Sequence, residues 1–244
     1  RAVRDPEPAP SSARAMAVEA GSAKRRKLVP EEGRAGDPRL GSLVIPMEDP
    51  APPGKLKVGL VWFPFDEGTL RNGGRGGARD SPDAVACLLQ RMGTAQNPEE
   101  GIDLTAHLRL VEVGEASGAT LEEAHASLEE LTARAFAAGV LPVAVGGSND
   151  QSYCHASAWL AHNPMARRGT VINIDAHLDV RPYVDGGKHH SGSPFFSLLE
   201  DPRFAEGRLV EFAAQGSQCS QCHADFVKQH GGTIMWLGNL RRSS

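Results

Sequence analysis

From residue 55 onward, short apolar runs alternate with longer stretches in which apolar residues recur at helical spacing. The first run, 56–63, is bounded by turn-forming residues, which is typical of a buried strand. Similar runs lie at 108–113, 141–147, 170–179, 208–214 and 233–238, and helical patterns lie at 81–92, 119–139, 148–162, 193–201 and 219–231. Strands that alternate with helices predict a three-layer α/β/α domain with a central, mostly parallel sheet.

The helix predicted over 119–139 has the clearest end signals. Thr120 stands at its N-cap with Glu123 three residues later, and Gly139 follows its last turn. The helix predicted over 81–92 begins at Ser81 and has proline in its first turn. A glycine-rich loop precedes that helix.

Residues 1–54 are rich in proline, alanine, glycine and charge and show no sustained period. We therefore expect a disordered leader at 1–54, followed by a single domain at 55–244. The leader contains the basic cluster KRRK at 24–27. A nuclear-targeting signal is one interpretation of this cluster, and a solvated tail is the favoured one.

Composition narrows the classes of function. The net charge of -4 favours neither a nucleic-acid partner nor a membrane surface. No apolar run approaches the roughly 18 residues of a membrane span, and the amino-terminal segment lacks the apolar core of a secretory signal. Four cysteines in 244 residues do not suggest a disulfide framework. We expect a cytoplasmic protein with no nucleic-acid or membrane partner.

Two predicted strand ends, 143–150 and 171–179, are unusually polar. Ligands of open parallel sheets bind beyond the carboxyl ends of the strands. Asp175, His177 and Asp179 follow one another at i, i+2 and i+4, which places them on one face if the backbone stays extended. Two carboxylates and an imidazole suit manganese, and without a cation they would repel one another. The alternative is that Asp179 caps a turn and His177 packs against a neighbouring strand.

Four segments carry a resemblance to a known family. Residues 175–179 are similar to its D-A-H-x-D metal motif, and 146–150 stand where it has Gly-Gly-x-His. Residues 63–85 are similar to a first strand, loop and helix, and 190–195 to an S-S-G-T-P-F segment. In this order they resemble the ureohydrolase family of arginases, agmatinases and formiminoglutamases, and formiminoglutamases most closely.

The resemblance implies a ureohydrolase fold, often assembled as a homo-oligomer, a trimer or a hexamer. It also implies a small amidine substrate, whose C–N bond is hydrolysed by a hydroxide that bridges two manganese ions. Carried over residue by residue, Asp175 would bridge both ions, His177 would bind one and Asp179 the other.

One position points to the subfamily. Ser191 precedes Gly192, as in formiminoglutamases, whereas arginases place a histidine there. This favours N-formimidoyl-L-glutamate as the substrate, with L-glutamate and formamide as products. Ser191 and the preceding His190 are candidate catalytic residues; the alternative for the adjacent histidines, His189 and His190, is that they are bystanders in a loop.

The glycine-rich loop supplies further candidates. Arg71, Asn72 and Arg75, together with Ser191, are candidates for binding the substrate's carboxylates. The alternative is that these loop residues hold the loop fold or a subunit contact.

Two departures from the family pattern weaken the metal site. Asn149 replaces the histidine of the Gly-Gly-x-His motif, and an amide oxygen is a weaker ligand for manganese than imidazole. Asp150 is a replacement candidate, although its side chain is expected to start on the opposite face. No S-x-D-x-D motif follows Asp179 before Ser244, so we expect a domain that is incomplete at its carboxyl end and that holds one manganese ion or none.

These departures leave two alternatives open. One is a catalytically inactive ureohydrolase-like protein with a structural or regulatory role, and the other is arginase or agmatinase activity. A C-x-x-C-H sequence at 219–223 matches the attachment motif of c-type haem, but nothing else supports haem, and we interpret it as coincidence.

Overall fold

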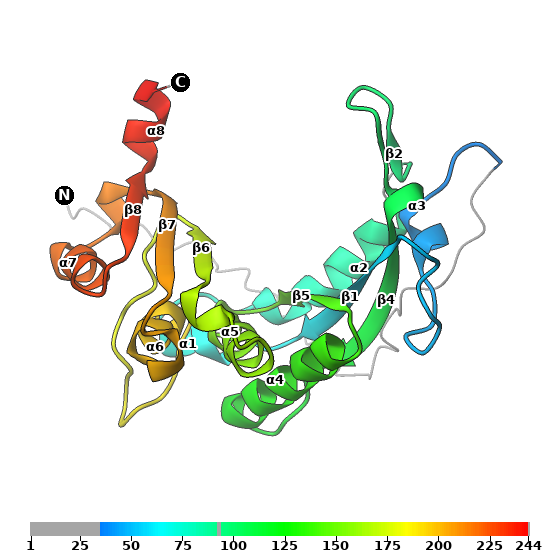
Figure 1. The fold of residues 1–244 in the computed structure, drawn as a ribbon. Coiled ribbons are helices and arrows are strands. Elements are labelled where there is room, and N and C mark those ends of the chain that lie inside the picture. Colours follow the sequence, from blue (N-terminus) through cyan, green and yellow to red (C-terminus); the bar gives the residue numbers. More distant parts are fainter. Residues whose placement is uncertain (1–34, 92–93, 244) are drawn as a thin grey trace, which may run out of the picture.

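The structure is a computed structural model that describes residues 35–91 and 94–243. Within these residues the longer strands form two parallel sheets of three strands each, with helices packed against them (Figure 1). A short antiparallel pair, β2 (Gln96–Asn97) and β3 (Ile102–Asp103), lies apart from both sheets. The predicted α/β class with parallel strands is confirmed.

The first half-sheet has the order β4-β1-β5, with all strands parallel. Its strands are β1 (Leu56–Phe63), β4 (Leu108–Glu115) and β5 (Leu141–Gly146). Side chains alternate along β1: Val61 and Phe63 pack against α4 (Leu121–Ala137), and Leu60 and Trp62 pack in a second cluster that includes residues of α2 (Ser81–Arg91). Both faces of this half-sheet are therefore covered.

The predicted caps of α4 are present. The Thr120 side chain accepts a hydrogen bond from the backbone N–H of Glu123, and the Glu123 carboxylate accepts one from the backbone N–H of Ala119. Gly139 follows the helix with a positive φ of 67°, a conformation that favours glycine.

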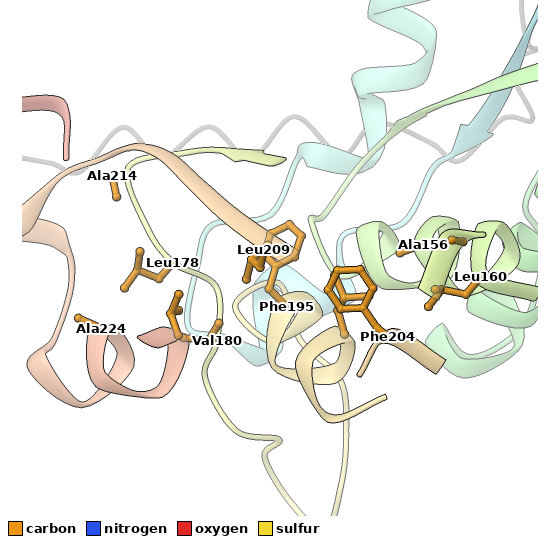
Figure 2. Close-up of a cluster of buried hydrophobic side chains, with 12 residues drawn as sticks. Ala156, Leu160, Leu178, Val180, Phe195, Phe204, Leu209, Ala214 and Ala224 are labelled. Atoms are coloured by element: carbon orange, nitrogen blue, oxygen red, sulfur yellow. The ribbon is translucent and has the colours of Figure 1, made fainter. Parts of the chain in front are cut away.

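The second half-sheet has the order β6-β7-β8, again parallel. Its strands are β6 (Thr170–Ile174), β7 (Arg208–Ala214) and β8 (Thr233–Trp236). One face packs against α5 (Gln151–His162), α6 (Pro194–Glu200) and α7 (Gln221–Gln229), in the core cluster drawn in Figure 2. The opposite face exposes Ile172, Ile174 and Met235.

No strand among the described residues joins the two half-sheets, so β5 and β6 are both edge strands (Figure 1). An apolar groove of about 550 Å³ lies between them, lined by Leu141 and Val143 of β5, Val171 and Ile172 of β6, and Trp159 of α5, among others. The sequence predicted one central sheet; the described strands form two halves.

Short elements complete the described chain. They are η1 (Leu40–Leu43), α1 (Glu67–Arg71), η2 (Ala78–Asp80), α3 (Leu104–His107), η3 (Ala166–Arg168), η4 (Pro202–Phe204), η5 (Gly216–Gln218) and α8 (Leu237–Ser243). None of the described helices combines the length and apolar character of a membrane span.

The expected boundary between leader and domain needs a correction. Leu43 and Val44 are buried, and Val44 forms a parallel bridge with Leu110 of β4. Ile45 and Met47 pack against the cluster beneath α4. Among the described residues, packing against the domain thus extends upstream of residue 55, at least to Leu43. The basic cluster at 24–27 lies outside the described residues.

Candidate metal and substrate site

The carboxyl ends of β5 and β6 meet at a cavity of about 260 Å³. The residues that line it are Thr69, Asn72, Gly147, Ser148, Asn149, Asp175, His177, Asp179, Arg181 and Ser191. The structure thus brings together all four candidate metal ligands and two of the four candidates for substrate binding.

The backbone that carries the acidic residues is not extended, which corrects the geometry assumed from the sequence. Strand β6 ends at Ile174, and the Asp175 carboxylate accepts a hydrogen bond from the backbone N–H of His177 at 2.7 Å. Asp179 has a positive φ of 44°. Leu178 and Val180 point into the core cluster (Figure 2), so the chain still alternates between cavity and core.

The candidate ligands pair with one another. Asp175 Oδ1 lies 3.1 Å from Nδ1 of His177, and Asn149 Nδ2 donates to Asp179 Oδ2 at 2.6 Å. The amide oxygen of Asn149 accepts from Ser152 Oγ. Across residues 35–91 and 94–243, no three His, Cys, Asp or Glu side chains are gathered as a metal-binding group. The donor types fit a divalent cation, but the side chains are not arranged around one.

Burial sets the electrostatics of this cavity. Desolvation, together with the neighbouring charge of Asp175, raises the pKa of Asp179 to about 6, although the hydrogen bond from Asn149 opposes the rise. A crowded pair of carboxylates in a partly desolvated cavity favours a bound proton or a bound cation.

The loop after β5 fixes Asp150 away from the cavity. Its carboxylate is buried, lies 2.5 Å from Nε2 of His125, and accepts a short hydrogen bond from Ser148 Oγ. A side chain at Gly68 would collide with this carboxylate, and one at Gly147 would collide with the carbonyl of Phe65. Asp150 therefore supports the loop and does not replace a metal ligand.

The glycine-rich loop divides into two roles. Asn72 lines the cavity, donates from Nδ2 to Ser191 Oγ at 3.1 Å, and accepts from Arg181 Nη1 at 3.2 Å. Arg71 instead bonds to Glu122 and to the carbonyl of His189, and it does not line the cavity. For Arg71, the structure therefore supports the loop-holding alternative.

Arg71 forms a charge pair with Glu122. Hydrogen bonding to Arg71 lowers the pKa of Glu122 to about 2, and the same contact raises the pKa of Arg71. Arg75 is exposed and also lies outside the cavity lining, so the structure does not place it with the other substrate-binding candidates.

His190 does not reach the cavity, contrary to its expected catalytic role. It is buried, its Nε2 lies 3.0 Å from the carbonyl of Pro182, and its Nδ1 accepts from the backbone N–H of Gly192. Both ring nitrogens are engaged by backbone groups, so the ring holds the loop. His189 packs against Tyr183 and Tyr153, and burial lowers its pKa.

Arg181 is a cavity residue that sequence reasoning missed. Its guanidinium lies beside Asn72, and its backbone N–H bonds to the carbonyl of Gly192. The signal was present in the chain: Arg181 continues the alternation of Asp175, His177 and Asp179 by one more step. A cation therefore faces the same cavity as the two carboxylates.

Comparison with known proteins places these residues in a family. The arginase family model matches residues 56–244. A formimidoylglutamase of Citrobacter koseri is 32% identical over 183 residues, which is 73% of this chain and 54% of that protein. The chain spans about half the length of the curated relatives it matches.

Solved structures agree with this match. Trypanosoma cruzi formiminoglutamase with Mn²⁺ has a TM-score of 0.76 and 43% sequence identity, covering 85% of this chain and 68% of that one. An Asn-to-His variant of the same protein with Mn²⁺ also has a TM-score of 0.76, at 42% identity, with coverage of 86% and 68%.

Proposed function

The chain belongs to the arginase family, and from this premise we propose that it contributes the metal and substrate residues of a hydrolase of linear amidines. The proposed substrate is N-formimidoyl-L-glutamate, and the products are L-glutamate and formamide. The observation that carries the proposal is the single cavity that holds Asp175, His177, Asp179 and Arg181. Relatives named formimidoylglutamase, and a Trypanosoma cruzi structure with Mn²⁺, support the substrate and the metal.

Asp175, His177 and Asp179 would hold manganese, and the amide oxygen of Asn149, which accepts from Ser152 Oγ, would be a weaker ligand. When bound, the metal supplies a water of lowered pKa and polarises the amidine. For these residues to serve as ligands, the contacts Asp175–His177 and Asn149–Asp179 must open.

The second polar group of the cavity suits the anionic part of this substrate. Arg181, Asn72 and Ser191 are joined by hydrogen bonds. A guanidinium flanked by an amide and a hydroxyl can bind a carboxylate. The cavity thus places a cation for a substrate carboxylate beside the residues proposed to hold the metal. This arrangement favours an amidine that carries a carboxylate, such as N-formimidoyl-L-glutamate, over agmatine, which has no carboxylate.

One observation favours a second candidate function. The acidic residues are paired with His177 and Asn149 rather than directed at a common point. An arginase-family protein with this arrangement and no catalysis would act as a structural or regulatory subunit. By family resemblance, we propose for either function a cytoplasmic homo-oligomer, a trimer or a hexamer. Light scattering measures its molar mass and so the number of subunits.

Two measurements on the purified chain separate these candidates. The first compares the manganese that stays bound to the wild type and to Asp175→Ala after loading with Mn²⁺ and dialysis. The second compares formamide release from N-formimidoyl-L-glutamate with urea release from arginine. The hydrolase proposal expects manganese and formamide from the wild type only. Equal, negligible manganese in both proteins would contradict it. Manganese without product would favour the non-catalytic candidate.

A further inference from the structure

Residues of β7 and of the loop that follows it form hydrogen bonds that hold the turn carrying Asp175 and His177 in place. The carbonyl of Ala176 accepts a hydrogen bond from the backbone N–H of Gln215 at 2.9 Å. The thiol of Cys219 reaches the same carbonyl at 3.4 Å. The metal segment is therefore positioned by residues that lie more than thirty positions later in the chain.

A buried carboxylate provides the third connection. Glu211 of β7 lies opposite Asn173 of β6 in the parallel register, and Asn173 Nδ2 donates to Glu211 Oε2 at 2.8 Å. The same Nδ2 lies 3.5 Å from the carbonyl of His177. Glu211 and Asn173 are both buried. Through one amide, a carboxylate of β7 is thus linked to the backbone of the metal turn.

Burial of the Glu211 carboxyl group at this position is energetically unfavourable. Its side chain has no solvent exposure, and Oε1 has no hydrogen-bond partner among the described residues. A buried acceptor without a partner destabilises the folded chain, because its hydration is lost and not replaced. The neighbours of Glu211 on the same face, Leu209 and Val171, are aliphatic, so an aliphatic side chain would fit this strand at lower cost.

The position of Glu211 relates it to the candidate site. Desolvation, with smaller contributions from the charges of Asp179 and Asp175, raises the pKa of its carboxyl to about 8, although the hydrogen bond from Asn173 opposes the rise. Its charge in turn raises the pKa of Cys219, whose main cause is burial. Glu211 therefore lies within electrostatic reach of two candidate metal ligands, although it does not line their cavity.

We propose that Glu211 is a positioning residue of the metal site, which acts through Asn173 to fix the turn at 175–177 and so present Asp175 and His177. Its role in metal affinity rests on the proposed function. Its role in ordering the turn does not, because the hydrogen bonds concerned are formed without metal. Residues that orient metal ligands in this way typically contribute about ten- to hundred-fold to affinity.

The test uses two substitutions and a matched control. Glu211→Gln keeps an oxygen that can accept from Asn173, and Glu211→Met keeps the volume but removes the acceptor. Asp201→Asn is the control, because Asp201 is also a buried carboxylate but bonds to Arg203 and Tyr153 away from the cavity. Amide hydrogen exchange of the metal-free chain and Mn²⁺ affinity are measured for all four proteins below their melting temperatures.

We expect Glu211→Met to speed exchange within 173–179 and to weaken Mn²⁺ binding at least about ten-fold. Glu211→Gln should restore slow exchange and most of the affinity, and Asp201→Asn should change neither. Wild-type exchange and affinity in folded Glu211→Met would overturn the proposal, and so would fast exchange in Glu211→Gln. If the wild type binds no Mn²⁺, the proposed function fails, and the exchange comparison still decides the role of Glu211.

Discussion

Both half-sheets are parallel and have three strands, but they differ in how they are covered. The first has a core cluster on each face, under α4 and under α2 with η1. The second has one cluster on one face, while Ile172 and Ile174 on the other face are 59% and 75% exposed. Parallel sheets normally have both faces covered.

The candidate ligands come from both halves, but most of them follow the half-sheet that is covered on one face. The candidate ligands Asp175, His177 and Asp179 follow β6, an edge strand of the half-sheet that is covered on one face. Asn149 follows β5, which belongs to the fully covered half. The cavity therefore depends on how the two halves are held relative to each other, and α5 contributes by packing between α4 and α6 (Figure 1).

The largest expected effect comes from core truncation. Leu128→Ala in α4 removes a fully buried side chain, and it should lower the free energy of unfolding by about 2–5 kcal/mol. Ile174→Ala on the bare face should change it by less than about 0.5 kcal/mol. Urea unfolding of the purified chain measures both. An equal cost for the two variants would show that the face bearing Ile174 is covered in solution.

The second prediction concerns pH and the buried carboxyl of β7. The pKa of Glu211 is raised from 4.5 to about 8, so the folded chain retains a proton that the unfolded chain releases over this range. Stability should therefore fall as pH rises from about 4.5 to about 8. Glu211→Gln should remove this dependence and be more stable than the wild type at pH 9 by about 1–3 kcal/mol.

Thermal unfolding of the metal-free wild type and Glu211→Gln at several pH values checks this sign. Parallel stability curves would mean that Glu211 ionises normally in the folded chain.

The third prediction exchanges the ligand that the first half contributes. Asn149→His replaces a neutral amide with an imidazole at the cavity, and it should tighten Mn²⁺ binding about ten-fold, or about 1.4 kcal/mol. Asn149→Ala is the control, because it breaks the same hydrogen bond to Asp179 without adding a ligand. Calorimetric titration distinguishes the two. A gain in both variants would show that release of Asp179, rather than the imidazole, improves binding.

Sequence patterns predicted the elements well where burial is regular. The apolar runs of β1, β4 and β5 and the caps of α4 are local signals, and the structure contains each of them. The pattern failed where contacts are irregular. Leu43 and Val44 pack onto β4 from a segment without a period, so nothing in the local sequence separates them from the residues before.

Six of the nine candidate site residues line the cavity, but the backbone conformation of the segment that carries Asp175 and His177 was not predicted. Asp175 was expected to continue β6, but its side chain bonds to the N–H of His177, a local bond that competes with an extended strand. The burial of His190 depends on Pro182 and Gly192, and the role of Arg71 on Glu122, which is 51 positions away. Such contacts depend on the folded loops, and spacing along the chain does not reveal them.

The smallest expected effect tests the contact between the end of α1 and the start of α4 in the first half. Arg71→Ala removes the ion pairs with Glu122 and Glu67, and because both glutamate side chains are half-exposed, the loss should be about 0.5–1 kcal/mol at pH 7. The pKa of Glu122 is lowered from 4.5 to about 2, so this contribution is present above about pH 4.5 and is lost as pH falls through about 2. The stability difference between wild type and Arg71→Ala should therefore be constant from pH 5 to 8 and shrink below pH 4.5.

Arg75→Ala, in the segment after α1, is the control and should have no effect at any pH, because Arg75 is exposed. A difference between wild type and Arg71→Ala that persists at pH 2 would mean that the bond from Arg71 to the carbonyl of His189, which does not titrate, holds the end of α1 in place of the ion pairs.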